Sequence, residues 1–270
     1  MRIPFVKMHG LGNDFIVLDA RELALPAITP PFARALADRK TGIGCDQLIV
    51  LAPSVHAAAR MRIFNADGGE VEACGNAARA VGLLLGTAAV VETLGGDLAV
   101  SPADGGVAVD MGEPRFDWAQ IPLAYAMDTL IMPVGWDGLD SPTAVNVGNP
   151  HVIFFVADTD AVDLSHIGPV IETDPLFPGR VNVNVATIET RARIRLRVWE
   201  RGVGETRACG TGACATAIGA MRRGLVDRAV TVAMAGGALS IVWGADNRIT
   251  MTGPAVESFR GSFESADFGG

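Results

Sequence analysis

The chain has 270 residues, a net charge of −8 and a mean hydropathy of +0.32. This length suggests about two domains, and the acidic charge without a basic run argues against a nucleic-acid partner. The longest apolar stretch, residues 77–91, is broken by Arg79 and two glycines. It falls short of the roughly 20 residues that a membrane span needs, and the N-terminus lacks an apolar signal core. We therefore expect a cytoplasmic protein with no membrane partner.

The first half of the chain alternates short apolar segments with glycine turns. Strands are predicted over residues 3–19 with a tight turn at 9–13, over 47–51 and over 59–64, helices over 30–40 and 75–86, and hairpins over 90–112. Residues 115–142 contain several prolines and little periodicity. This segment is predicted to join two halves.

The second half repeats the same order. Residues 145–149 are similar to the opening turn, and strands are predicted over 151–157, 181–188 and 191–199, helices over 165–173 and 210–223, and hairpins at the end. The pattern predicts an α+β fold of two pseudo-symmetric halves, each a sheet wrapped around one long helix. The predicted parts are residues 1–116, residues 117–254, and a C-terminal strand over 255–270 that packs back on the first half.

One motif occurs twice, 135 positions apart, and each copy contains a Cys-Gly pair. At that offset, without a gap, nine pairs are identical: Arg60/Arg195, Arg62/Arg197, Gly69/Gly204, Glu70/Glu205, Ala73/Ala208, Cys74/Cys209, Gly75/Gly210, Ala78/Ala213 and Ala80/Ala215. An internal repeat of half the chain predicts two related halves that each present one cysteine at the same place.

Each repeated cysteine precedes a predicted helix, where unpaired N–H groups and the helix dipole favour a thiolate. The backbone N–H groups that follow, at Gly75 and Gly210, suit a carboxylate. A single cysteine at a helix start more often serves packing than catalysis, but duplication of the whole motif favours catalysis here. Cys45 and Cys214 have no cysteine partner at this offset and are predicted to be ordinary buried residues.

Amide side chains form a second group of candidates: Asn13, Gln47, Asn65, Asn76, Asn149 and Asn182. Turn chemistry alone explains Asn65 well, but it explains Asn149 and Asn182 less well. A buried amide needs hydrogen-bond partners, which a substrate would supply. Glu200 and Arg201 are either a solvated ion pair or a charge pair that binds a zwitterionic ligand.

The composition argues against a cofactor. Lys7 and Lys40 are the only lysines, and neither lies near the repeated motif, whereas a pyridoxal-phosphate enzyme needs a Schiff-base lysine. The four cysteines form no C-x-x-C pair, and with only four histidines a zinc site is not expected. We therefore expect neither a cofactor nor a metal.

Several motifs, in order along essentially the whole chain, closely resemble those of the diaminopimelate epimerase family. They are HGLGNDF from His9, GIGCDQ from Gly42, FNADG from Phe64, ACGN from Ala73, GNPH from Gly148, RVN from Arg180, ERGVGET from Glu200 and ACGTGACA from Ala208. The resemblance implies an isomerase that needs no pyridoxal phosphate and converts LL-2,6-diaminopimelate to the meso form, for lysine and peptidoglycan synthesis. It also implies an active site between two similar halves and a homodimer.

The resemblance also implies roles for individual residues. Cys74 and Cys209 are the implied catalytic pair. The implied substrate contacts are Asn13, Gln47, Asn65, Gly75, Asn76, Asn149, Asn182, Glu200, Arg201, Gly210 and Thr211. His151 and Glu200 are implied to tune the cysteines. The chain departs from the family pattern at Cys45, Ala77 and Asn184.

The expected mechanism is two-base proton exchange, in which one cysteine removes the Cα proton as a thiolate and the other delivers a proton as a thiol from the opposite face. Three alternatives stay open. The first is a racemase of the same fold that acts on another amino acid. The second is a same-fold isomerase without a working thiol pair, and the third is a non-enzymatic redox or metal-binding protein. Asn65, Asn182, Glu200 and Arg201 suit a second amino-acid head group, which favours diaminopimelate.

Overall fold

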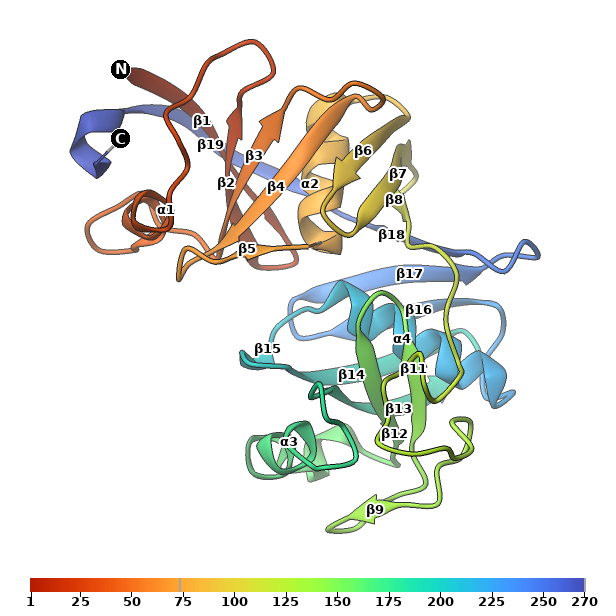
Figure 1. Cartoon of the computed structure of the whole chain (residues 1–270). Coiled ribbons are helices and arrows are strands. Elements are labelled where there is room, and N and C mark those ends of the chain that lie inside the picture. The colour runs from red at the N-terminus through yellow and green to blue at the C-terminus, as the bar shows by residue number, and fades with distance from the viewer. Residues whose placement is uncertain (73, 270) are drawn as a thin grey trace. The chain divides into compact units, whose positions relative to one another are not determined.

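The computed structural model describes residues 1–72 and 74–269, so Ala73 of the repeated motif and Gly270 lie outside the described residues. The chain divides into two compact units (Figure 1). The first unit comprises Met1–Val109 together with Gly253–Gly270, and the second comprises Asp110–Thr252. The first unit is therefore built from both ends of the chain.

The first unit contains one sheet that follows the sequence order closely. Its strands are β1 (Arg2–Gly10), β2 (Asn13–Asp19), β3 (Gln47–Ala52), β4 (Ala59–Asn65), β5 (Glu70–Val71), β6 (Ala89–Thr93), β7 (Gly96–Ala103), β8 (Gly106–Asp110) and β19 (Val256–Glu264). Along β1-β2-β3-β4-β6-β7-β8, successive pairs are antiparallel, parallel, antiparallel, parallel, antiparallel and antiparallel. β19 adds an antiparallel strand beside β1.

The second unit repeats this series of pairings. Its strands are β9 (Gly135–Trp136), β10 (Leu139–Asp140), β11 (Thr143–Asn146), β12 (Pro150–Phe155), β13 (Asn182–Thr190), β14 (Arg193–Glu200), β15 (Gly204–Thr206), β16 (Ala229–Met234), β17 (Gly237–Trp243) and β18 (Ile249–Gly253). Along β11-β12-β13-β14-β16-β17-β18, the same six relations recur in the same order. The repeat predicted from the sequence is thus a repeat of architecture.

Each unit has one long helix inside its sheet. α2 (Gly75–Leu85) contacts β1, β6 and β7, and α4 (Gly210–Arg222) contacts β11, β12, β16 and β17. Because these strands come from both ends of each strand order, each sheet curves around its helix, as the ribbon shows (Figure 1). Alanine and glycine are frequent in both helices, so strands can approach closely; α4 is buried almost throughout, and α2 is buried from Gly75 to Gly82. The predicted fold class is confirmed.

The remaining helices are short. They are α1 (Pro30–Ala37), α3 (Leu164–Glu172), and the 3₁₀ turns Thr159–Ala161 and Ser265–Phe268. α1 is predicted to reach Lys40 but ends at Ala37, since Asp38 has an extended backbone. The Asp38 carboxylate accepts hydrogen bonds from the backbone N–H groups of Lys40 and Thr41 at 2.8 and 2.7 Å, which replaces the next helical turn. No helix among the described residues is long and apolar enough to cross a membrane.

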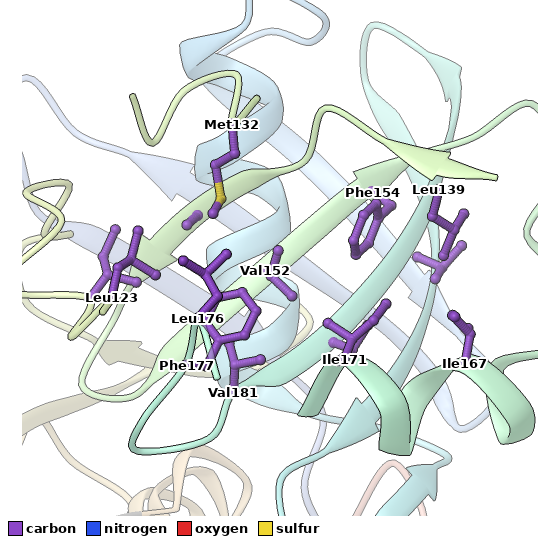
Figure 2. Close-up of a cluster of buried hydrophobic side chains, with 14 of the residues drawn as sticks. Leu123, Met132, Leu139, Val152, Phe154, Ile167, Ile171, Leu176, Phe177 and Val181 are labelled. Carbon is purple, nitrogen blue, oxygen red and sulfur yellow. The ribbon is translucent and has the colours of Figure 1, made fainter. Parts of the chain in front are cut away.

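Residues 115–142 are predicted to join the halves, but they belong wholly to the second unit. Leu123, Met132 and Leu139 from this segment are buried in the core of that unit, together with Phe154 of β12 (Figure 2). In the same view, α3 directs Ile167 and Ile171 into the cluster. The segment lacks periodicity because single apolar side chains, rather than a regular face, fill this core.

Candidate active site

The candidate residues of the first unit gather at one end of its sheet. Asn13 opens β2 and Gln47 opens β3, which runs parallel to β2, while Asn65 closes the antiparallel β4. Gln47 Nε2 donates to Asn65 Oδ1 at 2.9 Å across the last register pair. α2 begins at this end, with Cys74 as its N-cap.

The Cys74 thiol is partly exposed and lies beside Asn13. Cys74 Sγ is 3.9 Å from Asn13 Oδ1, which also accepts from Asn76 Nδ2 at 3.2 Å. Asn76 Oδ1 in turn accepts from Arg79 Nη2 at 2.8 Å. The first turn of α2, from Gly75, is therefore tied to the start of β2 by side-chain amides.

Arg79 was not among the predicted site residues, although it is fully buried. Its Nε donates to the Pro254 carbonyl at 3.3 Å, and its Nη2 holds Asn76. A lone arginine inside an alanine-rich helix is a signal that could have identified it, because a buried cation requires fixed partners.

A charged network supports Asn13 from the other side. Asn13 Nδ2 donates to Asp46 Oδ2 at 3.0 Å, and Asp14 is bonded to Lys7 and Arg39 at 2.6 Å each. Burial would raise the pKa of Asp14, but the hydrogen bonds from Arg39 and Lys7 outweigh it and hold that pKa well below its usual range. One of the two lysines is therefore engaged in an ion pair.

Cys209 is the N-cap of α4, and its side chain is buried. Its Sγ accepts from the Gly212 N–H at 3.3 Å and lies 3.5 Å from Thr211 Oγ1. Burial, followed by the negative charge of Glu200, raises the pKa of the Cys209 thiol well above its ordinary value. The helix start was predicted to lower this pKa; at Cys209 the effect of burial is larger.

Glu200 ends β14 beside Cys209. Burial raises the pKa of its carboxyl group, whose Oε1 accepts from Thr206 Oγ1 at 2.5 Å. Arg201 Nη1 donates to the Gly179 carbonyl at 2.9 Å, and within the described chain no ion pair joins Glu200 to Arg201. The solvated Glu200–Arg201 ion pair, one of the two interpretations of these residues, is therefore not formed.

Asn182 is buried at the start of β13. Its Nδ2 donates to the Pro150 carbonyl at 2.9 Å, and its Oδ1 accepts from the Arg201 N–H at 3.0 Å. The argument that a buried amide here needs a substrate as partner therefore does not hold. Asn182 instead fixes the Arg201 backbone to the start of β12, and its contact with substrate stays a prediction.

His151, in β12, is fully buried between two amides. Its Nε2 lies 2.9 Å from Asn149 Oδ1, and its Nδ1 lies 3.1 Å from Asn184 Nδ2. Burial, with a further contribution from the charge of Arg201, lowers the pKa of His151 to about 3. The imidazole is neutral at physiological pH. Asn149 Nδ2 also lies 3.3 Å from Thr211 Oγ1, which connects His151 to the start of α4.

The predicted site residues thus form two groups, one in each unit. The first unit holds Asn13, Gln47, Asn65, Cys74, Gly75 and Asn76, and the second holds Asn149, His151, Asn182, Glu200, Arg201, Cys209, Gly210 and Thr211. In both units the group lies where the strands meet the N-terminus of the long helix. This end of each helix offers backbone N–H groups to an anion.

The other two cysteines are buried, as predicted. Burial raises the pKa of the Cys45 thiol to about 12, so it is a poor source of thiolate. Cys214 lies inside α4 and is fully buried. Among the described residues, no group of three or more His, Cys, Asp or Glu side chains is arranged to hold a metal ion.

Solved structures of other proteins share this fold. A hydroxyproline epimerase from Agrobacterium vitis, with bound trans-4-hydroxy-L-proline, superposes with a TM-score of 0.67 over 97% of this chain and 91% of its own, at 15% identity. A phenazine biosynthesis protein of the PhzF family from Bacillus anthracis superposes with a TM-score of 0.70 over 98% and 99%, at 16% identity. At these identities the likeness shows a shared fold.

Sequence comparison is more specific. The chain is 68% identical to the diaminopimelate epimerase of Erythrobacter litoralis, over 99% of this chain and 100% of that protein. It is 64% identical to that of Rhizorhabdus wittichii, over 100% and 98%. The profile of the family described as diaminopimelate epimerase matches residues 5–117 and 143–257, one segment in each half. The chain belongs to the diaminopimelate epimerase family.

Proposed function

We propose that this protein converts LL-2,6-diaminopimelate to meso-diaminopimelate, without a cofactor, by proton exchange between two cysteines. The observation that carries the proposal is the duplicated helix start: Cys74 caps α2 and Cys209 caps α4 in two units with the same strand pairing. Inversion at Cα requires a base on one face and an acid on the other. Two copies of one reactive group meet that requirement.

In the proposed step, the thiolate of one cysteine takes the Cα proton and becomes a thiol. The electron pair left on Cα delocalises into the α-carboxylate. The thiol of the other cysteine then gives its proton to the opposite face of Cα and becomes a thiolate. The roles reverse in the other direction, and the resting state is restored by proton exchange with solvent.

The helix N-termini have a second task in this mechanism. Negative charge develops on the α-carboxylate as the proton leaves, and the backbone N–H groups at Gly75 and Gly210 are oriented to stabilise an anion. Exclusion of water strengthens these dipoles. Asn65 and Asn182, with Glu200 and Arg201, are proposed to bind the distal amino-acid group, which makes diaminopimelate the preferred substrate.

We further propose that the protein works in the cytoplasm as a homodimer and serves lysine and peptidoglycan synthesis. The support is family membership together with a reaction whose product is a diamino acid. Sedimentation of the purified protein tests the dimer.

The decisive test is incubation with LL-diaminopimelate in deuterated water, after dialysis against a chelator and a carbonyl reagent. We expect loss of the Cα proton signal in proton NMR and formation of the meso form, with no cofactor added. Turnover that returns only with pyridoxal phosphate or zinc would contradict cofactor independence. Exchange on proline or histidine, but not on diaminopimelate, would favour a racemase of another amino acid.

A further inference from the structure

A line of hydrogen bonds within the second unit ends at the sulfur of Cys209. Asn184 Nδ2 lies 3.1 Å from His151 Nδ1, and His151 Nε2 lies 2.9 Å from Asn149 Oδ1. Asn149 Nδ2 lies 3.3 Å from Thr211 Oγ1, which is 3.5 Å from Cys209 Sγ. We call this series the Asn184 chain. Its far end, Asn184, is fully buried and is not one of the predicted site residues.

The direction of the hydrogen bonds is decided at Asn184. Its Nδ2 lies 3.1 Å from the Val152 carbonyl oxygen, which only accepts, so the amide must present its NH₂ group on this side. The Asn182 carbonyl oxygen is a third neighbour at 3.4 Å, but the two nearer acceptors, the Val152 carbonyl oxygen and His151 Nδ1, each take one hydrogen. The imidazole is neutral, so a donor against Nδ1 leaves its proton on Nε2.

The same direction continues to the sulfur. His151 Nε2–H donates to Asn149 Oδ1, which turns the NH₂ group of Asn149 toward Thr211. Thr211 Oγ1 accepts that bond, which leaves its own hydroxyl hydrogen available for donation to Cys209 Sγ, 3.5 Å away. Together with the Gly212 N–H, the chain presents two donors to the sulfur, and donors favour a thiolate over a thiol.

We propose that Asn184 is a positioning residue for Cys209: it selects the Nε2–H tautomer of His151 and thereby makes Thr211 donate to the sulfur. The inference rests on the proposed catalytic role of Cys209.

The first unit shows that the fold does not require this chain. In the equivalent strand pairings, Asn182 matches Gln47, so His151 and Asn184 match Phe15 and Ile49. Both of these residues are fully buried and apolar. The same architecture therefore forms with hydrocarbon at both positions, and the polar pair under Cys209 needs another explanation.

Packing at Asn184 points the same way. Asn184 Oδ1 is buried and, within the described residues, has no hydrogen-bond partner, which is unfavourable for stability. A Cβ at Gly212 would lie 2.9 Å from this oxygen, so glycine is needed there, whereas Ala77 stands at the matching position in α2. Asn184 therefore lowers stability in two ways. Its buried oxygen has lost water without gaining a partner, and it requires glycine, a poor helix former, at position 212.

The pH dependence of Cys209 reflects the charged groups around it. Glu200 of β14 faces the sulfur and opposes the thiolate. His151 of β12 is neutral and acts only through Asn149, while the charge of Arg201 acts on His151. From the strands β12 and β13, the contribution that favours the Cys209 thiolate is the Asn184 chain.

The first measurement is the His151 tautomer. Long-range proton–nitrogen NMR of histidine-labelled protein separates the two ring nitrogens, and a His151→Gln variant identifies the signals. We expect Nε2 to carry the proton in the wild type. Asn184→Leu should give a mixture of tautomers. A wild-type Nδ1–H tautomer would overturn the inference, even if the variant fails to fold.

The second measurement is alkylation of Cys209 by iodoacetamide as a function of pH, in a Cys74→Ala background, with peptide mapping. At pH values below the midpoint of the Cys209 alkylation profile, Asn184→Leu should slow alkylation about three- to tenfold. This is the size of effect expected when a hydrogen bond to a charged group is weakened. Thr211→Val should do the same, and the double variant should add little to either. Thr187→Val, which removes another hydrogen bond of β13, is the matched control.

With Cys74 intact, Asn184→Leu should lower kcat on LL-diaminopimelate by a similar factor and leave KM nearly unchanged. A folded Asn184→Leu protein with unchanged tautomer and alkylation would overturn the inference. The first two readouts need no substrate. If the proposed reaction is not found, the tautomer and alkylation results still test the Asn184 chain. If the Asn184 chain is contradicted, the proposed reaction is unaffected.

Discussion

Single residues divide the two cysteines into different environments. Cys74 is partly exposed and lies 3.9 Å from the acceptor oxygen Asn13 Oδ1. Cys209 is buried and accepts from the Gly212 N–H. The donor at Cys209 favours its thiolate, against the larger effects of burial and of the Glu200 charge, which raise its pKa. Two residues that look identical in the repeat are therefore not chemically equivalent.

Replacement of either cysteine should nearly stop net epimerisation. Cys74→Ser and Cys209→Ser should each lose about 10²–10⁴-fold in kcat, because serine is a far weaker acid and each cysteine serves one face of Cα. The measurement is turnover of LL and meso substrates in parallel. Cys45→Ala is the control and should stay near wild type. Near-normal epimerisation by Cys74→Ser, with loss in Cys45→Ala, would contradict the two-cysteine mechanism.

Removal of the charge on Glu200 should lower the pKa of Cys209. The carboxylate raises that pKa, second only to burial, so Glu200→Gln should increase the thiolate fraction at a given pH. Alkylation of Cys209 against pH measures the shift. Glu205→Gln, on an exposed carboxylate paired with Arg197, is the control and should change nothing at Cys209. A midpoint that rises in Glu200→Gln would show that the charge is not the dominant influence of this residue.

His151 should make the protein sensitive to acid. Its pKa is about 3 when folded and near 6.5 when unfolded, so below pH 6.5 the unfolded state binds the proton and the folded state does not. As the pH is lowered from about 6.5 to 3, the free energy of unfolding should decrease, by on the order of 1.4 kcal/mol per pH unit from this residue. Urea unfolding at several pH values tests this. His151→Gln should show a shallower slope, and equal slopes would contradict the prediction.

At the scale of elements, much of the fold was predictable because its signals are local. Glycine turns and apolar periodicity located the strands and both long helices to within a few residues. Residues 115–142 were assigned mostly to the second half, but their place in its core was not predicted because their core residues are isolated. The end of α1 depends on a carboxylate at Asp38 that competes for backbone N–H groups.

The candidate site was predictable where a residue repeats and hidden where it does not. Cys74 and Cys209 were predicted from the duplication, and the amides from turns, from the apolar strand around Asn182 and from the family resemblance. Arg79 and Asn184 belong to one unit each, so no offset relates them to a matching residue. Their signal is a polar side chain inside an apolar element, which a sequence alone does not connect to a cysteine.

The start of α4 should tolerate no larger residue at position 212. A Cβ there would lie 2.9 Å from Asn184 Oδ1 and 3.1 Å from Val198 Cγ2. Gly212→Ala should therefore lower the free energy of unfolding by about 1–3 kcal/mol, measured in urea. Gly219→Ala is the control in the same helix. Its Cβ would meet nothing nearer than the Thr143 methyl group at 3.3 Å, so its free energy of unfolding should stay within about 1 kcal/mol of wild type. Equal effects would show that the contact with Asn184 is not tight.

At the scale of the whole molecule, the proposed mechanism requires both sulfur atoms to reach one carbon atom. Mild oxidation with diamide in the absence of substrate should then link Cys74 to Cys209 and abolish activity, and dithiothreitol should restore it. Peptide mapping identifies the bond, and bound substrate should protect against it. A disulfide only between Cys209 and Cys214, or none at all, would contradict a shared site.

The pairing of β19 with β1 also has a consequence for biosynthesis. Arg2 pairs with Glu264 and His9 with Val256, so β1, which pairs with the nearby β2, gains its second neighbour only after the whole second unit has been synthesised. The second unit, in contrast, is continuous in sequence and is whole once residue 252 has emerged. Nascent chains stalled near that point should carry a folded second unit beside an unfinished first one, so the residues around Cys74 are organised last.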